Sequence, residues 1–93
     1  MRLDKFLKVS RLAKRRTDAK EALEAGRILD PRNGRALKAG YDVKPGDVLE
    51  IHYARKILTV RVLEVPLRVV PGLKPAGLYA IVGERKEDPT EWL

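Results

Sequence analysis

Residues 1–27 read MRLDKFLKVSRLAKRRTDAKEALEAGR, and this stretch decides the fold. Apolar residues recur through it at helical spacing. They are Leu3, Phe6 and Leu7, followed by Ala19, Ala22 and Leu23. The pattern predicts two short amphipathic helices, over about residues 3–12 and about 17–25, joined by a basic corner at residues 14–16. Gly26 then supplies a left-handed stop for the second helix.

The start of the second helix has two readings. Thr17 and Asp18 form an N-terminal signal in which the hydroxyl caps free amides and the helix dipole favours the carboxylate. Alternatively the helix begins nearer Arg15. In that case Arg15 and Arg16 lie in the first turn, where their side chains and free amides can bind one phosphate together.

Positive charge is concentrated in the first half of the chain. The first sixteen residues hold seven basic side chains and one acid, Asp4, for which the spacing predicts an ion pair with Lys8. Residues 1–46 hold 13 Lys and Arg against 6 Asp and Glu, whereas residues 47–93 hold 7 of each. A charge for general solubility would not need this confinement. The distribution favours a polyanionic partner, nucleic acid ahead of an anionic membrane surface.

The rest of the chain predicts a small sheet. Asn33-Gly34 favours a tight hairpin turn between residues 27–29 and 35–38, and Pro31 makes that hairpin short or bulged. Alternating apolar residues predict strands over residues 48–53 and 57–63, and a last strand covers 78–82 after a loop rich in proline and glycine. The expected class is α+β, with one domain over residues 1–83 and a charged, flexible tail over 84–93. In this tail, Trp92 either packs against the domain or makes no contact with it.

The sequence offers no set of residues for catalysis or metal binding. His52 is the only histidine and is expected on the solvent face of a strand, and Ser10 is expected to be a packing residue. There is no cysteine, no phosphate-binding glycine loop, no signal peptide and no membrane-spanning run. We therefore expect a monomeric cytoplasmic binding protein, neither an enzyme nor a membrane protein, that needs no cofactor. Few aromatic rings are present, which favours structured RNA over a single strand.

The order of these motifs resembles a known family. RLDKFLKVSRLAKRRTDAKEALEAGRI, the Asn33-Gly34 turn, Lys38 and VKPGDVLEI follow one another as in the αL RNA-binding domain, named for small-subunit ribosomal protein four. The resemblance covers about residues 1–53 and implies two helices packed on a small, mostly antiparallel sheet with a further C-terminal strand.

Within that family the chain looks most like the stand-alone RqcP branch, related to the heat-shock protein fifteen group. The resemblance extends through KRRTDAKE, DVKPGD and LYAIVGE. It implies a factor of ribosome-associated quality control that binds large ribosomal subunits carrying stalled peptidyl-tRNA, with large-subunit ribosomal RNA, the tRNA and a quality-control protein as partners. Two features depart from the family. ILDPR is longer than the usual strand, and the tail is acidic where the heat-shock branch has a long basic helix.

The resemblance also assigns the RNA-facing residues. On the helical surface these are Arg2, Lys5, Lys8, Arg11, Arg15, Arg16 and Lys20. The charge pattern adds Lys14 at the corner and Arg27, Arg35 and Lys38 beside the second helix, while Arg32 is as readily an ordinary exposed side chain. The alternatives are a general factor for ribosomal RNA binding or assembly, and a basic adaptor for an acidic protein surface. A modifying enzyme that carries this domain would need a second, catalytic domain.

Overall fold

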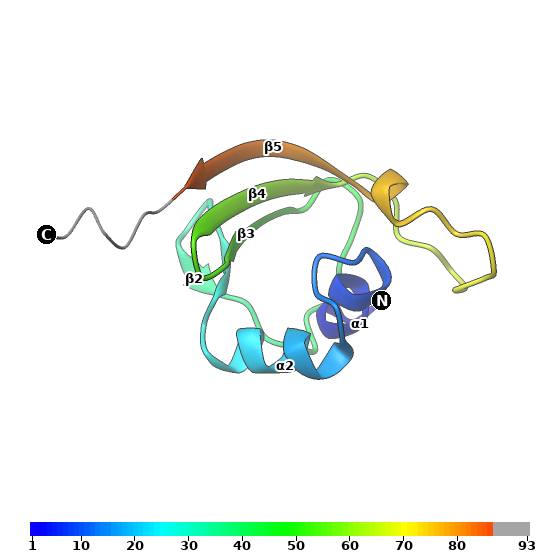
Figure 1. Cartoon of the computed structure of the whole chain (residues 1–93), viewed down its shortest axis with the longest axis horizontal. Coiled ribbons are helices and arrows are strands. Elements are labelled where there is room, and N and C mark those ends of the chain that lie inside the picture. The colour runs from blue at the N-terminus through cyan, green and yellow to red at the C-terminus, as the bar shows by residue number, and fades with distance from the viewer. Residues whose placement is uncertain (87–93) are drawn as a thin grey trace, which may run out of the picture.

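The structure, a computed structural model, describes residues 1–86. Its elements follow in the order α1 (Leu3–Val9), α2 (Arg16–Glu24), β1 (Ile28–Asp30), β2 (Arg35–Ala36), β3 (Val48–His52), β4 (Lys56–Val62), the 3₁₀ turn η1 (Pro75–Gly77) and β5 (Tyr79–Lys86). The strands form one antiparallel sheet in the order β2-β1-β3-β4-β5. Both helices lie under the concave face of this curved sheet (Figure 1). The predicted α+β class is confirmed.

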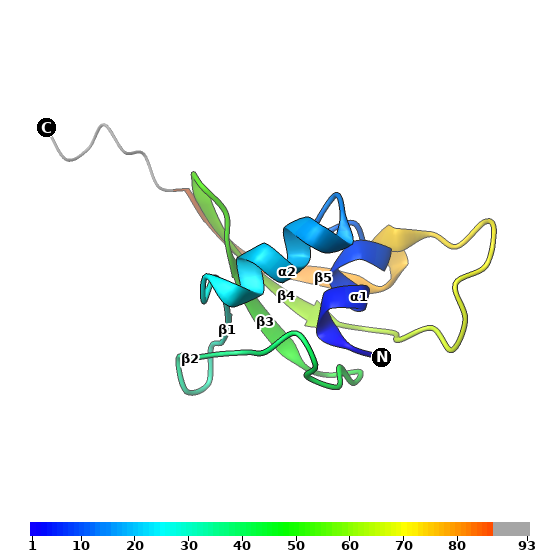
Figure 2. The same ribbon diagram turned by 90° about the horizontal axis from the view of Figure 1, so that it is seen from below.

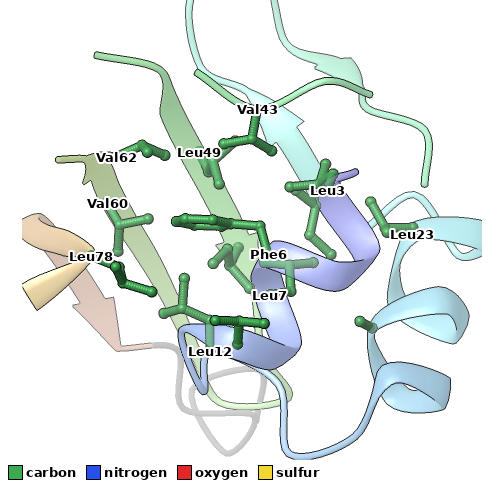
Figure 3. Close-up of a cluster of buried hydrophobic side chains, with 14 of the residues drawn as sticks. Leu3, Phe6, Leu7, Leu12, Leu23, Val43, Leu49, Val60, Val62 and Leu78 are labelled. Carbon is green, nitrogen blue, oxygen red and sulfur yellow. The ribbon is translucent and has the colours of Figure 1, made fainter. Parts of the chain in front are cut away.

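Helix α1 is held to the sheet by its apolar face. Leu3, Phe6 and Leu7 are at most 1% exposed. Phe6 points into a cluster that includes Leu49 and Val60, which the β3–β4 register places opposite each other (Figure 3). The helical spacing read from the sequence is therefore the spacing that builds the core.

The first turn of α1 is capped by backbone from a distant part of the chain. The amides of Leu3 and Asp4 donate to the carbonyls of Tyr41 (2.8 Å) and Ala39 (3.3 Å). The side chain of the N-cap residue, Arg2, makes no capping bond. The segment that supplies these carbonyls runs past the start of α1 before it enters β3 (Figure 2), so α1 depends on chain far downstream of it.

Helix α1 is shorter than the prediction of about residues 3–12. It ends at Val9, and Arg11 adopts a left-handed backbone with φ of 60°. The amide of Ala13 then donates to the Leu7 carbonyl at 3.0 Å. This bond folds the connection between the helices, residues 10–15, back over α1, and this whole connection is called the corner below. Leu12 still reaches the core, with 7% of its surface exposed. It does so from this corner rather than from a helix.

Helix α2 begins at Arg16, which agrees with the second of the two predicted starts. Thr17 makes no capping bond, so the predicted cap is wrong. The predicted stop at Gly26 is confirmed, because its φ is 71° and its amide donates to the Leu23 carbonyl while that of Arg27 donates to Ala22. These two bonds form a Schellman motif.

The β1–β2 hairpin is short, as predicted, but its turn is not the expected two-residue one. Four residues, 31–34, connect the strands, and the Gly34 amide donates to the Asp30 carbonyl at 2.7 Å. Gly34 has a positive φ, whereas Asn33 does not. A tight turn of type I′ needs positive φ at both positions, so the Asn-Gly preference is overridden within the longer ILDPR stretch.

Strand β5 continues four residues past its predicted end at Val82. Residues 84–86, assigned to the flexible tail by sequence, pair with β4 as far as Lys56 opposite Lys86, with one register shift on the way. The rest of the tail, including the prediction for Trp92, lies outside the described residues. Helices in residues 1–86 are all too short and polar to cross a membrane.

The central place of Phe6 gives a stability prediction. We expect Phe6→Ala to lower the free energy of unfolding by about 3–5 kcal/mol, because it removes a fully buried ring and leaves a cavity. Leu67→Ala is the control, since Leu67 is fully exposed in the loop after β4. Urea unfolding of both variants measures the difference, and equal losses would contradict this account of the core.

Candidate nucleic-acid interface

A buried carboxylate joins the starts of the two helices. Asp4 is 0% exposed, and its Oδ1 accepts from Arg2 Nε (3.2 Å) and from the Lys5 amide (2.8 Å). Its Oδ2 accepts from Nε and Nη2 of Arg16, both at 3.4 Å. The predicted pair with Lys8 is therefore wrong. Asp4 points inward between the helices and binds arginine from each of their N-terminal ends.

The surroundings of Asp4 favour its charged form. Burial by itself would raise the pKa of this carboxyl, but the hydrogen bonds from Arg2 and the Lys5 amide and the charge of Arg16 outweigh it. The net effect is a pKa lowered from 3.8. The side chains of Arg2 and Arg16 remain 58% and 48% exposed, so each keeps N–H donors free to face a ligand.

A second group of cations lines a cleft beside the corner. Lys8, Arg11 and Lys14 form one wall of a cavity of about 590 Å³, and the loop after β4 forms the other. All three side chains are exposed. Within residues 1–86 none of them forms a salt bridge. Their charges are therefore available to an anion.

The corner is fixed by a residue that sequence reasoning did not select. The hydroxyl of Tyr53, just after β3, donates to the Leu12 carbonyl at 2.6 Å. Burial raises the pKa of this hydroxyl, so that it stays a protonated donor at neutral pH. The sequence placed Tyr53 only at the end of the strand predicted over residues 48–53, and no sequence signal identifies its partner, which lies 41 residues away.

The other predicted RNA-facing cations of the helices lie on exposed helix surfaces or in a second cleft. Lys5, Arg15 and Lys20 are exposed on the two helices or their ends. Arg27 lines a second cleft, of about 550 Å³, together with Arg11 and Lys14. The helices and the corner thus present cations on two clefts as well as around Asp4.

The hairpin contributes less than its charge count suggests. Arg32 binds Asp30 through Nε (3.2 Å) and Nη2 (3.1 Å), and these bonds lower the pKa of Asp30. The charge of Arg32 is therefore satisfied within the hairpin. Arg35 lies on the edge strand β2 and Lys38 follows it, both exposed, so the hairpin and not the helices positions them.

Other polar groups have local partners. His52 is half-buried, not fully on the solvent face, and its Nε2 lies 2.7 Å from Glu50 Oε1. Ser10 is buried, as predicted, and donates to the Leu7 carbonyl. In the described chain no three acidic or histidine side chains gather as metal ligands.

The geometry agrees with comparisons to known proteins. The S4 domain, an RNA-binding domain, matches residues 1–49. Over 86 residues the chain is 50% identical to the RQC P-site tRNA stabilizing factor of Bacillus subtilis, covering 92% of this chain and 96% of that one. The chain belongs to the S4-domain family of RQC P-site tRNA stabilizing factors.

Other members of this family are also similar over most of their length. The Listeria innocua RQC P-site tRNA stabilizing factor is 56% identical over 88 residues, which cover 95% of this chain and 92% of that protein. The Helicobacter pylori factor is 39% identical over 80 residues. These relatives are named for stabilizing tRNA, and the family is one of RNA-binding factors rather than enzymes.

A solved structure shares the fold. Heat Shock Protein 15 of Vibrio cholerae, solved as a trimer, superposes with a TM-score of 0.73 at 25% sequence identity, covering 88% of this chain and 81% of that one. The resemblance to the heat-shock protein fifteen group expected from sequence is confirmed. The expectation that the present chain is a monomer stays a prediction.

The contacts of Asp4 predict a pH-dependent contribution to stability. We expect Asp4→Asn to cost about 1–3 kcal/mol at pH 7, because charge-assisted bonds to two arginines are lost. The folded-state pKa lies below 3.8, so the contribution is complete above that pH and is lost as pH falls through the folded pKa.

Urea unfolding of wild type and Asp4→Asn between pH 3 and pH 7 tests this. The gap between the two midpoints should narrow in acid. Asp18→Asn is the control, since Asp18 is an exposed carboxylate in the first turn of α2. A gap that is constant across the pH range would show that the charge of Asp4 is not what matters.

Proposed function

We propose that this protein stabilises P-site tRNA on large ribosomal subunits during ribosome-associated quality control, with its helices and corner against RNA. The observation that carries the proposal is the set of exposed cations that the fold holds in place around Asp4 and along the two clefts. The similarity to tRNA-stabilizing relatives over nearly the whole chain supports it.

Fixed cations suit structured RNA better than a mobile basic arm would. A guanidinium whose orientation is set before binding loses less conformational freedom when it meets a phosphate. Asp4 orients Arg2 and Arg16, and Tyr53 fixes the backbone of the corner that carries Arg11 and Lys14. RNA duplexes are recognised mainly by backbone shape and 2′-hydroxyls, which such an array can contact.

The proposed partners follow from this role. They are large-subunit ribosomal RNA, the tRNA of the obstructed subunit and a protein of the same quality-control process, all met in the cytoplasm. The predicted RNA-facing residues remain a proposal, strongest for Arg2, Arg16, Lys8, Arg11 and Lys14, whose positions the fold constrains. Lys5, Arg15, Lys20 and Arg27 extend the surface, whereas Arg35 and Lys38 lie on or after the edge strand.

Binding to isolated subunits tests the proposal directly. We expect higher affinity for large subunits that carry P-site tRNA than for empty ones, measured by co-sedimentation of the purified protein with each. The tRNA itself supplies phosphates to the interface, so its removal should weaken binding. Equal affinity for the two kinds of subunit would reject the tRNA-stabilizing role and favour a general ribosomal RNA-binding factor.

Affinity should also fall steeply with salt. Each phosphate neutralised contributes about −0.7 to the log–log slope for a single strand, so roughly five contacts give a slope near −3 to −4. Titrations of the protein with subunits at increasing potassium chloride measure the slope. A flat titration would remove the electrostatic argument altogether.

Position should matter more than the number of charges. We expect the double variant Lys14→Ala/Arg15→Ala to lose about 2 kcal/mol or more of binding free energy, roughly 30-fold in affinity. Arg85→Ala/Lys86→Ala is matched, because it also removes one exposed arginine and one exposed lysine that are adjacent in sequence, here on β5. Equal losses of subunit binding would mean that net charge governs affinity.

Alanine at Arg2 and Arg16 is a poorer test. It would leave the buried carboxylate of Asp4 without its ionic partners, so the fold itself would lose stability. Lysine at either position keeps the positive charge but not the planar group that reaches Asp4 and a phosphate together. A loss of subunit binding by a folded Arg16→Lys variant would support that double role, and unchanged binding would contradict it.

A further inference from the structure

The cleft beside the corner has two walls of opposite character. One wall carries Lys8, Arg11 and Lys14, and the other is built by the loop between β4 and η1, mainly from Val69, Val70 and Leu73. This loop projects beyond the sheet on the side where α1 lies (Figure 1). The volume, about 590 Å³, lies within the range of small-ligand pockets.

The apolar wall is held by a defined turn. The Leu73 amide donates to the Val70 carbonyl at 3.2 Å, and Gly72 has φ of 88°. Pro71 and Gly72 thus occupy the two central positions of a type II turn, the residues that this turn prefers. Val70 stays 51% exposed, whereas Leu73 packs partly against the core. The turn therefore holds an apolar side chain beside the cleft instead of burying it.

The cationic wall includes a strained position. Arg11 is the only residue of the described chain other than glycine with positive φ. A left-handed backbone costs a residue with a Cβ roughly 1–2 kcal/mol, which glycine would not incur. Arginine at this position adds a cationic side chain to the lining of the cleft at the expense of stability.

We propose that this cleft binds a single unpaired RNA nucleotide, with the base on Val70 and Leu73 and its phosphate on Arg11 and the neighbouring lysines. This rests on the proposed function and names the RNA element that the surface selects. A nucleotide has one anionic and one flat, largely apolar part. The cleft has a wall for each.

The lining also indicates how the nucleotide is read. Apart from the three cations, no lining side chain carries a hydrogen-bonding group, and no acid lies among them. Base edges are distinguished by hydrogen bonds from polar side chains. The wall that meets the base has no such side chain, so we expect the cleft to accept an unpaired nucleotide of any base while its cations hold the phosphate.

Three RNA hairpins of one stem sequence test the proposal with the full chain. The first is fully paired, the second has one unpaired uridine in the stem, and the third has an abasic nucleotide at that place. We expect the wild type to bind the second about fivefold more tightly than the other two. This is at the lower end of what stacking on an aromatic ring provides, since the wall is aliphatic.

Two variants locate the effect. Val70→Ser should abolish the preference for the unpaired uridine while keeping affinity for the paired hairpin. Leu67→Ser is the matched control, because Leu67 is an exposed apolar residue of the same loop that does not line the cleft. Arg11→Gly should lower affinity for the hairpin with the unpaired uridine and leave the chain as stable as wild type or more so.

The outcomes separate this proposal from the proposed function. Equal wild-type affinity for all three hairpins, or a preference that survives Val70→Ser, overturns the nucleotide site while salt-dependent RNA binding stands. If the abasic hairpin binds as tightly as the uridine one, the cleft holds phosphate alone and the proposal fails. Failure to bind any hairpin or subunit overturns both, and displacement of RNA by an equally charged acidic peptide would assign the cleft to a protein.

Discussion

Asp4 lies where the two helices begin, out of contact with water and bonded to arginine from both. Two guanidinium groups brought close together would repel each other, and the carboxylate between them removes that cost. It uses one donor of Arg2 and two of Arg16, so most of their donors remain available to a ligand. The basic surface is thus organised by a negative charge beneath it.

The two halves of the chain supply different parts of the structure. Residues 47–86 contribute β3, β4 and β5, which form most of the sheet and supply strand side chains to the core. The positively charged first half supplies the two helices, which lie against the concave face of the sheet (Figure 1). The exception is the loop between β4 and η1, which returns to the helices and lines the cleft with Val69 and Val70. The sheet supports the surface, and this loop completes one side of it.

The spacing of apolar residues in the sequence correctly predicted the buried faces of the helix and the strand. The face of Leu3, Phe6 and Leu7 and the alternation around Leu49 and Ile51 were readable because each repeats with the period of its element. Asp4 was misassigned to Lys8 because spacing along one helix ignores the neighbouring helix, and the Tyr53–Leu12 bond joins residues 41 positions apart. The cations were found from sequence, but the cleft between three of them and a distant loop depends on tertiary folding.

The capping of α1 by the backbone at residues 39 and 41 affects when this helix can fold during synthesis of the chain. A seven-residue helix is not stable by itself in water, and the cluster around Phe6 includes Val60 and Leu78 from late in the chain. The residues of α1 are therefore made well before the residues that hold them in place. A nascent chain therefore carries these positive charges before the residues that fix their positions have been made, and the ordered surface forms only once Leu78 has emerged.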